Sequence, residues 1–454
     1  MYFKQIPTPG LGCFSYIVGC PAAGVMCVVD PKRDIAEYLE IANKKKMRIT
    51  HIFDTHVHAD HISGALELAA VTGADICLHE SAPLGYKFTK LKHGDSFEFG
   101  KAVVKALHSP GHTPNSVSYL VTDRARSEEP QMLLSGDLLF VGDVGRPDLP
   151  GDEILDEQVV NLYDSLFEVL ADLPDGLEVY PGHGENSLCG SNLSAKPVTT
   201  LGYERKANPK LQNKDFTAFK KSVLTALPMR PQSFSHIIAT NIKGTPLIEP
   251  MVLNGRALKA DEVAKEKKDG AVIVDLRGYL AFGGGHIPGS VNIDASILVA
   301  KWVGTVVPAN SKIILILDNP NDYKRLIWNF LFIGYDNVLG WLDGGVQAWV
   351  DSGRCIQSMQ FISNCDFEQA LKSNNPPKVL DVRTKKEFDE SHLKDAIFVP
   401  MKDLLDEANC LVKKDEEAVV LCQTGSRSYV AASLLQARGC AKIKALAGGM
   451  TSLG

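Results

Sequence analysis

An internal repeat in the second half of the chain constrains the fold more than any other feature. A segment that begins with VDLRGYL at residue 274 is matched by LDVRTKKEF, which begins at residue 380. In both copies an Asp-x-Arg motif precedes a histidine by nine residues, counted from the arginine. A repeat of about 105 residues is too long for the stacked units of a solenoid, so it predicts a duplicated α/β domain.

The two copies differ where a later apolar run ends, in IILILDNPND in the first copy and VVLCQTGSRS in the second. The second copy has Cys422 at this place, and the first has Asp318. After Cys422 comes a short polar loop that leads into a helical run. The loop consists of Gln423, Thr424, Gly425, Ser426 and Arg427. Such a loop directs backbone N–H groups inward at the positive end of a helix, which favours a thiolate or a bound anion.

This arrangement resembles the rhodanese sulfurtransferases, over about residues 250–454 as two copies. The resemblance implies that Cys422 is the nucleophile that carries sulfur as a persulfide, and that the loop through Arg427 cradles the sulfur anion. Asp318 cannot carry sulfane sulfur and would repel an anion, so we expect the first copy to be an inactive, structural domain. A phosphatase loop needs Cys-x5-Arg, whereas Arg427 is the fifth residue after Cys422, which disfavours that chemistry.

The first 190 residues alternate strand-like and helical runs, which predicts an α/β domain. We expect strands at residues 15–18, 25–30, 49–54, 133–135 and 177–180, and helices at 34–45, 66–72 and 159–170. Residues 190–245 are more polar and partly helical, and we interpret them as a cap over the site formed by the preceding residues.

Histidine and aspartate residues gather in this first part, each after an apolar run. Four of them lie in the stretch THVHADH alone. The seven candidates are His56, His58, Asp60, His61, His112, Asp137 and His183. An H-x-H-x-D-H cluster is much more specific for a metal site than a lone histidine. The pattern resembles the metallo-β-lactamase superfamily over about residues 10–190, and this resemblance implies an αββα sandwich, followed by the two rhodanese-like α/β domains with parallel sheets.

Two metal chemistries are open to these nitrogen and oxygen ligands. Two zinc ions would hydrolyse a thioester, as glyoxalase II does, by lowering the pKa of bound water. One Fe(II) held by two histidines and one carboxylate would leave positions for substrate sulfur and O2. The number of ligands does not decide between them. The rhodanese-like cysteine favours iron, because a site that handles sulfane sulfur needs a partner that makes or consumes persulfides.

The segment GDLLFVGDVGRPDLPG at residues 136–151 resembles the persulfide dioxygenases. This resemblance implies that His56, His112 and Asp137 bind one Fe(II) per chain. It also implies that Arg146 receives the acidic tail of the thiol carrier, with Asp148 supporting the turn. The other candidates would line the pocket or support the ligands: His58, Asp60, His61 and His183.

The chain has ten cysteines and no CxxC pair. We therefore expect buried, inert thiols rather than a disulfide framework. Cys189 is the exception, because it lies six residues after His183 in GHGENSLCG. Many persulfide dioxygenases carry bulky polar residues there, and two interpretations of Cys189 stay open: a structural thiol, or a second sulfur acceptor near the iron.

The whole chain most resembles the bacterial persulfide dioxygenase–sulfurtransferase fusions. We expect a dioxygenase domain with a helical cap at residues 1–245, an inactive rhodanese-like domain at 246–356 and an active one at 357–454. The implied substrates are low-molecular-weight persulfides of glutathione, coenzyme A or a similar thiol, with O2 and sulfite, and thiosulfate is the product. The alternatives are a zinc-dependent thioester hydrolase of glyoxalase II type and a non-catalytic sulfide or persulfide sensor.

Charge and hydropathy narrow the class of partner. The formal net charge of -6 and the lack of a long basic run argue against nucleic acid. No run of 18 apolar residues occurs, so a membrane span is not expected. The first residues lack the features of a secretory signal. We expect a cytoplasmic protein that forms a homo-oligomer.

Overall fold

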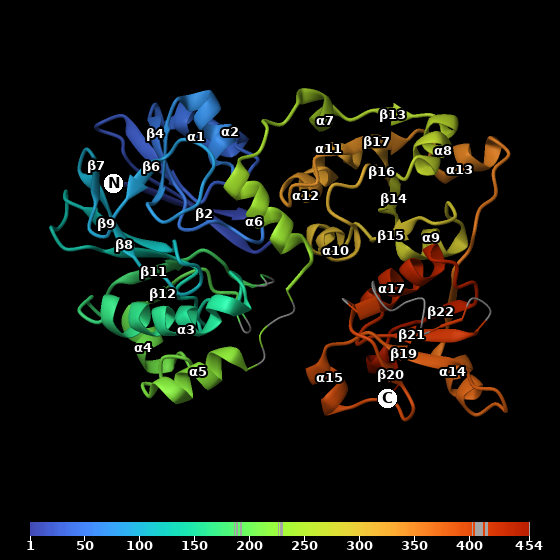
Figure 1. Ribbon diagram of the computed structural model, residues 1–454. Helices are drawn as coiled ribbons and strands as arrows, with labels where there is room; N and C mark the ends of the chain where they lie inside the picture. Colours follow the sequence, from blue (N-terminus) through green and yellow to red (C-terminus); the bar gives the residue numbers. More distant parts are fainter. Residues whose placement is uncertain are drawn as a thin grey trace. The chain divides into compact units, whose positions relative to one another are not determined.

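The computed structural model describes the chain except for a few short stretches. These are residues 186, 188, 191–192, 226, 228–229, 402, 405–411, 414–415 and 454. The chain divides into two compact units (Figure 1). The first is Met1–Leu247 with Leu331–Gly334, and the second is Ile248–Phe330 with Tyr335–Gly454. Within the described part of the chain, no helix is both long and apolar enough to cross a bilayer.

The first unit contains two six-stranded sheets. The first sheet runs β1 (Tyr2–Thr8), β2 (Cys13–Cys20), β3 (Val25–Val29), β4 (Arg48–Phe53), β5 (Asp75–His79), β6 (Thr89–Leu91). The second runs β12 (Thr199–Thr200), β11 (Glu178–Pro181), β10 (Met132–Gly136), β9 (Val117–Asp123), β8 (Ala102–His108), β7 (Ser96–Phe99). The helices are α1 (Ala36–Lys45), α2 (Ala65–Thr72), α3 (Leu155–Asp164), α4 (Leu201–Ala207), α5 (Phe216–Leu224) and α6 (Ser233–Lys243).

Side-chain alternation along the strands builds the layers. In β2, Tyr16 and Val18 point inward and pack with Tyr119 of the second sheet. Ile17, between them, faces the other way and packs with Tyr38 of α1, as expected for the two faces of a strand. The outer face of the second sheet packs against α3 and α5 in the same manner. Figure 1 shows the sheets between these helix layers, and the expected αββα sandwich is confirmed.

Most of the expected elements of the first unit are confirmed with small shifts at their ends. The predicted strands correspond to β2, β3, β4, β10 and β11. The helix expected at residues 159–170 begins earlier, at Leu155, and is regular only to Asp164. It continues as a π-helical turn over Ser165–Val169. Hydrophobic periodicity marks the buried stripe of a helix but not its first turn, which explains the early start.

The second unit contains two five-stranded parallel sheets with the same strand order. The first runs β13 (Ala257–Leu258), β17 (Val338–Leu342), β16 (Ile313–Ile316), β14 (Val272–Asp275), β15 (Val291–Asn292). The second runs β18 (Gln360–Ile362), β22 (Ile443–Leu446), β21 (Ala418–Leu421), β19 (Lys378–Asp381), β20 (Ile397–Phe398). The predicted duplication is therefore confirmed at the level of topology.

The helices of the second unit connect these parallel strands. They include α7 (Pro250–Asn254), α8 (Ala260–Lys268), α9 (Tyr279–Gly284), α10 (Val299–Val306), α11 (Tyr323–Leu326), α12 (Trp328–Leu331), α13 (Gly345–Asp351), α14 (Asn364–Leu371), α15 (Lys385–Glu390) and α17 (Ser426–Ala437). A parallel pair of strands needs such crossover connections, because the chain must return to the same end of the sheet.

The repeated Asp-x-Arg and histidine motif forms the same hydrogen bonds at the end of a strand and of a helix in both copies. Arg277 forms a fork with the carboxylate of Asp275 at the end of β14 and donates to the Gly285 carbonyl. His286 donates from Nδ1 to the Phe282 carbonyl at 2.9 Å, which closes the end of α9. The second copy repeats these contacts with Asp381, Arg383 and His392.

Candidate metal centre and thiol loop

Loops that follow four strands bring the seven predicted ligands together at one edge of the sandwich. All seven side chains are buried. The loop after β4 carries His56, His58, Asp60 and His61, and the loops after β8, β10 and β11 carry His112, Asp137 and His183. Residues that are far apart in sequence thus meet because their strands end on the same side.

Three buried ligand atoms gather at one point without a hydrogen-bond partner among the described residues. They are His56 Nε2, His112 Nε2 and Asp137 Oδ2, and they lie within 4.8 Å of one another. The Oδ2 atom is 3.3 Å from His112 Nε2 and 3.9 Å from His56 Nε2. Since each unpartnered buried polar atom costs about 1–3 kcal/mol, the three together fit a bound cation.

In His56 and His112 the Nδ1 atom, which lies away from this point, forms a hydrogen bond, so the lone pair of Nε2 is directed at the point. His112 donates from Nδ1 to the Arg146 carbonyl at 2.9 Å. Thr55 Oγ1 donates to Asp30, so it accepts from His56 Nδ1 at 2.9 Å. Burial lowers the pKa of both His56 and His112 below the ordinary value. Both rings are therefore neutral at pH 7, with an acceptor nitrogen ready for a metal.

Three of the remaining ligand-type residues, Asp60, His61 and His183, satisfy one another instead, whereas His58 Nδ1 has no partner among the described residues. His183 bonds from Nδ1 to Asp137 at 2.6 Å and from Nε2 to Asp60 at 2.8 Å. Asp60 also bonds His61 Nδ1 at 3.1 Å. Burial alone would lower the pKa of His183, but the adjacent Asp137 carboxylate holds it well above the ordinary value. His183 is thus a buried imidazolium between two carboxylates.

Sequence reasoning missed three residues of this cluster. Cys13 of β2 donates from Sγ to Asp60 Oδ2 at 3.0 Å, although 47 residues separate them. Asp30 bonds His58 Nε2 at 3.1 Å, and Asp54 lies 4.0 Å from the same atom. Burial raises the pKa of Asp54 to about 6. Asp54 lies two residues before His56, so its position beside the motif was available as a signal. No local motif marks Cys13 or Asp30, because their strands, β2 and β3, meet the cluster only in the folded sheet.

In the second unit, Cys422 follows β21 directly and is fully buried. The Gly425 N–H donates to its Sγ at 3.1 Å, and Gly425 has a φ of +99°, which favours glycine. Arg427 lies in the first turn of α17 and forms a fork with the Glu387 carboxylate, at 2.8 and 2.5 Å. Burial alone would raise the pKa of the Glu387 carboxyl, but the hydrogen bonds from Arg427 and Thr384 lower it to about 2. The loop therefore places an N–H group and a held guanidinium around the thiol.

Comparison with known proteins agrees with this division of the chain. Residues 9–183 match the metallo-beta-lactamase superfamily, and residues 259–352 and 364–453 match the rhodanese-like domain. A metallo-beta-lactamase structure from Staphylococcus aureus subsp. aureus COL is 32% identical with a TM-score of 0.67, and covers 75% of this chain and 98% of its own. The chain belongs to the metallo-beta-lactamase superfamily. Two rhodanese-like domains follow its metallo-beta-lactamase domain.

Curated relatives of this superfamily member carry different activities in their names. Hydroxyacylglutathione hydrolase of Polaromonas sp. is 36% identical over 38% of this chain and 64% of its own length. Persulfide dioxygenase ETHE1 of Bos taurus is 25% identical over 53% of this chain and 87% of its own. Beta-lactamase hydrolase-like protein of Agrobacterium fabrum is 28% identical over 55% and 62%. The match spans less than two thirds of the first and third of these relatives.

Arg146 and Asp148 of the metallo-beta-lactamase domain are paired with each other. The guanidinium forms a buried fork with the carboxylate at 2.7 and 2.8 Å, while the Arg146 carbonyl holds His112. The backbone here comes very close to a ligand loop, because a Cβ on Gly145 would lie 1.9 Å from the Asp137 carbonyl. A substrate carboxylate that binds Arg146 must therefore share it with Asp148.

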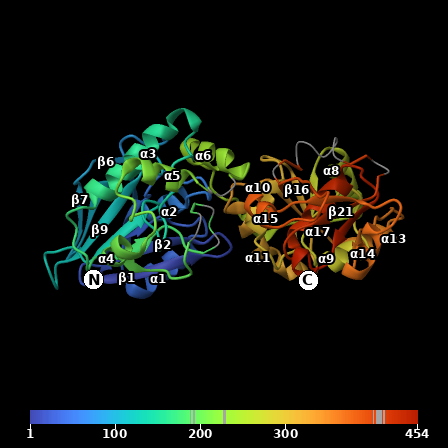
Figure 2. The same ribbon diagram turned by 90° about the horizontal axis from the view of Figure 1, so that it is seen from below.

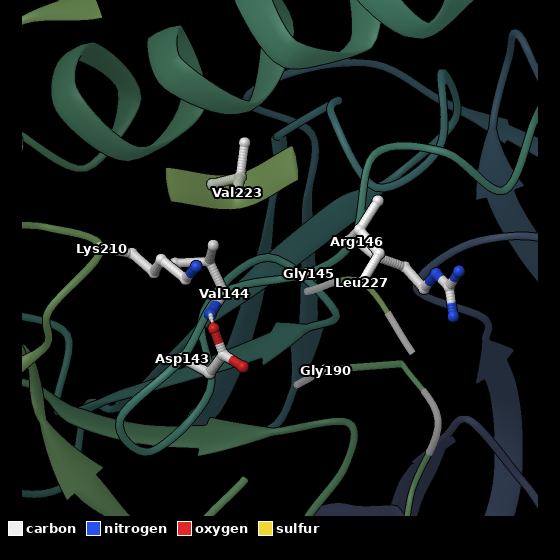
Figure 3. A pocket seen from close by; sticks show the side chains of 8 residues that line it. All are labelled: Asp143, Val144, Gly145, Arg146, Gly190, Lys210, Val223 and Leu227. Carbon is white, nitrogen blue, oxygen red and sulfur yellow. Dashed lines mark hydrogen bonds between the residues drawn. The ribbon is translucent and has the colours of Figure 1, made fainter. Parts of the chain in front are cut away.

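A small pocket adjoins this segment (Figure 3). Its lining residues are Asp143, Val144, Gly145, Arg146, Gly190, Lys210, Val223 and Leu227. The Arg146 guanidinium points away from Lys210 and Asp143 in this view. The segment therefore lines the pocket mainly with its backbone, and the guanidinium of Arg146 points away from Lys210 and Asp143.

Cys189 lies in the cluster, with its sulfur near Asp137 and His183. Burial raises the pKa of its thiol well above the ordinary value. A thiol held in the protonated form is a poor nucleophile. Its predicted role as a sulfur acceptor therefore requires a change in its surroundings and stays a prediction.

A stacked histidine pair beside the metal loops gives a prediction for stability. The rings of His79 and His108 lie 3.7 Å apart and almost parallel, and His108 donates to the Pro114 carbonyl. Burial and the neighbouring His108 lower the pKa of His79 to about 4. Between about pH 6.5 and pH 4, His79 binds a proton in the unfolded chain but not in the folded chain. The free energy of unfolding therefore decreases as the pH is lowered through this window.

We expect His79→Gln to remove part of this loss. Its thermal midpoint should fall less than that of the wild type between pH 7 and pH 5, by about 2–4 °C. Circular dichroism melts in matched buffers measure this difference. Replacement of the exposed His93 by glutamine is the control. Parallel pH profiles for the wild type and His79→Gln would contradict the role of the stacked pair.

Proposed function

We propose that this protein is a persulfide dioxygenase joined to a sulfurtransferase. One low-molecular-weight persulfide, one O2 and one water give one thiol, one sulfite and two protons. A second persulfide then supplies the sulfane sulfur that converts sulfite to thiosulfate. Similarity to the persulfide dioxygenase ETHE1 of Bos taurus and the presence of two rhodanese-like domains support this pairing of activities.

The observation that carries the first half is the set of unpartnered atoms at the metal centre. Two imidazole nitrogens and one carboxylate oxygen form the donor set of non-haem Fe(II) oxygenases, which leaves positions open. Bound there, Fe(II) would supply adjacent positions for the persulfide sulfur and for O2. Asp60, His61 and His183 are already satisfied by one another, which supports one metal ion per chain rather than two.

The other residues of the centre bind and orient. Arg146 lies beside the His112 loop, and we assign it to the acidic end of the thiol carrier, with Asp148 holding its fork in place. The His183 imidazolium holds a proton between Asp137 and Asp60. Burial of these groups excludes water, which strengthens each charge interaction.

For the second half, we assign Cys422 as the sulfur carrier. The Gly425 N–H and the charge of Arg427 lie at its sulfur, where they would stabilise a terminal sulfur anion. In the transfer step the sulfite sulfur bonds to the outer sulfur, the bond to Cys422 breaks, and the thiolate leaves with the electron pair. Joining the two sites in one chain lets sulfite be used before it diffuses away.

A zinc-dependent thioester hydrolase of glyoxalase II type is the second candidate. His58 Nδ1 is a fourth unpartnered atom in the cluster, and a fourth ligand suits tetrahedral zinc. Similarity to hydroxyacylglutathione hydrolases also favours it.

Metal analysis with oxygen uptake separates the two candidates. Protein purified without added metal should contain about one iron per chain and consume O2 when given glutathione persulfide. Without O2, sulfite should not form. Two zinc ions per chain, with hydrolysis of S-lactoylglutathione and no O2 uptake, would replace the proposal with the hydrolase.

A further inference from the structure

Helix α6 covers the loop that carries four of the candidate ligands. In the stretch THVHADH, Val57 and Ala59 lie between the ligand-type residues. Val57 belongs to an apolar cluster that packs against Ile238 of α6, and Ala59 packs with Phe234 of the same helix. Figure 1 and Figure 2 both show α6 along the side of the first unit. The helix is therefore in direct contact with the ligand loop.

One polar side chain of α6 is buried against this loop. Asn241 is only 7% exposed. Its Nδ2 donates to the carbonyls of His58 and His61, each at 2.9 Å, although 180 residues separate it from His61. Its Oδ1 accepts from the Ser63 N–H at 3.1 Å. Two carbonyls and one N–H fix the orientation of the amide, because only Nδ2 can donate and only Oδ1 can accept.

The two carbonyls that Asn241 holds lie on either side of Asp60. Asp60 Oδ2 accepts from His183 Nε2 at 2.8 Å, and His183 Nδ1 donates to Asp137 Oδ1 at 2.6 Å. The other oxygen of this carboxylate, Asp137 Oδ2, is one of the three unpartnered ligand atoms. The loop backbone and these hydrogen bonds therefore connect the Asn241 amide with the carboxylate that faces the metal position.

The two halves of the loop are held by different residues. Asp30 accepts from the Thr55 N–H at 2.6 Å, and Asn115 accepts from the Val57 N–H at 2.8 Å. Both contacts lie before residue 58, whereas all three contacts of Asn241 lie between residues 58 and 63. Loss of the Asn241 amide would leave buried polar groups of the second half unpaired, which costs free energy. A shift of that half would relieve the cost and displace Asp60.

We propose that Asn241 is a positioning residue of the metal centre. Its amide fixes residues 58–63 so that Asp60 and His183 hold the Asp137 carboxylate in place for the cation. This inference rests on the metal centre of the proposed function, and it deepens that proposal by adding a residue that no ligand motif contains. It applies to iron and to zinc alike, because it concerns the position of the ligands.

The test is a metal titration of the full-length protein after removal of metal by chelation. Fe(II) is added without O2 in competition with a chelating dye. Asn241→Ala should raise the Kd for Fe(II) about tenfold, the lower end of the loss for residues that support metal ligands. The visible absorption bands of bound Co(II), which report the ligand geometry, should shift in the same variant. Asn241→Ser keeps one donor and should lie between the wild type and Asn241→Ala.

Asn208→Ala is the matched control, because Asn208 is a buried asparagine of the same unit with the same number of side-chain hydrogen bonds. Its Nδ2 donates to the Asp143 carbonyl and the Glu204 carboxylate, and its Oδ1 accepts from the Lys210 N–H. This variant should lower the thermal midpoint of the metal-free protein as Asn241→Ala does. It should keep the wild-type Kd for Fe(II) and the wild-type Co(II) spectrum.

The outcomes separate this inference from the proposed function. An unchanged Kd and an unchanged Co(II) spectrum in Asn241→Ala would overturn the role of Asn241 alone. Equal losses of affinity in the Asn241 and Asn208 variants would also overturn it, because they indicate a general loss of structure. A wild type that binds Fe(II) but consumes no O2 with glutathione persulfide would remove the dioxygenase and leave the role of Asn241 standing. A wild type that binds neither Fe(II) nor Zn(II) would remove both.

Discussion

Asp137→Asn is expected to leave the protein without bound iron and to reduce O2 uptake with glutathione persulfide at least about 100-fold, since even supporting residues of metal sites cost 10–100-fold. Asp137 is the one carboxylate among the three unpartnered ligand atoms. An amide oxygen carries no charge and binds a divalent cation weakly. The substitution also removes the anion that holds the His183 imidazolium. Iron content and O2 consumption measure the two effects.

Asp60→Asn is the sharpest comparison for this variant. Asp60 belongs to the paired set, with His61 and His183, and not to the unpartnered one. Under a single-iron site it should keep iron, whereas under a two-metal site it should lose half of the metal. Sulfur transfer from Cys422 without O2 should be normal in both variants, which checks the folding of the chain. Full O2 uptake by Asp137→Asn would refute the assigned iron site.

The second large effect is expected for Cys422→Ser. This variant should consume O2 as the wild type does but release sulfite in place of thiosulfate, with thiosulfate formation reduced by about 1000-fold or more, as for loss of a catalytic nucleophile. A hydroxyl cannot carry sulfane sulfur, although it can still accept the Gly425 N–H bond. Chromatography of the sulfur oxyanions, together with an oxygen electrode, measures both halves of the reaction.

Cys365→Ser is the matched control, because Cys365 is an exposed thiol on α14 of the same domain. It should give wild-type yields of thiosulfate. Unchanged thiosulfate in Cys422→Ser would remove this residue from the scheme. Loss of O2 uptake in Cys422→Ser would show that the two sites do not work independently.

Local patterns predict much of this fold. The repeat and the apolar runs indicate parallel α/β domains, and the two copies do share one strand order. Histidine and aspartate at strand ends predict a metal centre, and the structure brings all seven together. These features can be predicted because the periods of strands and helices, and the short spacings between ligands, are properties of neighbouring residues. The ends of elements are harder to predict, as the π-helical turn over Ser165–Val169 demonstrates.

The sequence by itself determined the kinds of domain, and it predicted the candidate metal ligands and the thiol in its loop, because each of these features depends on residues that lie close together in the chain. Only the tertiary structure decided which ligand atoms stand open and which are paired. It also decided that Cys13 bonds Asp60 of the metal centre and that Glu387 pairs with Arg427 of the thiol loop. The partners in each contact lie far apart in the sequence and come together only when the chain folds.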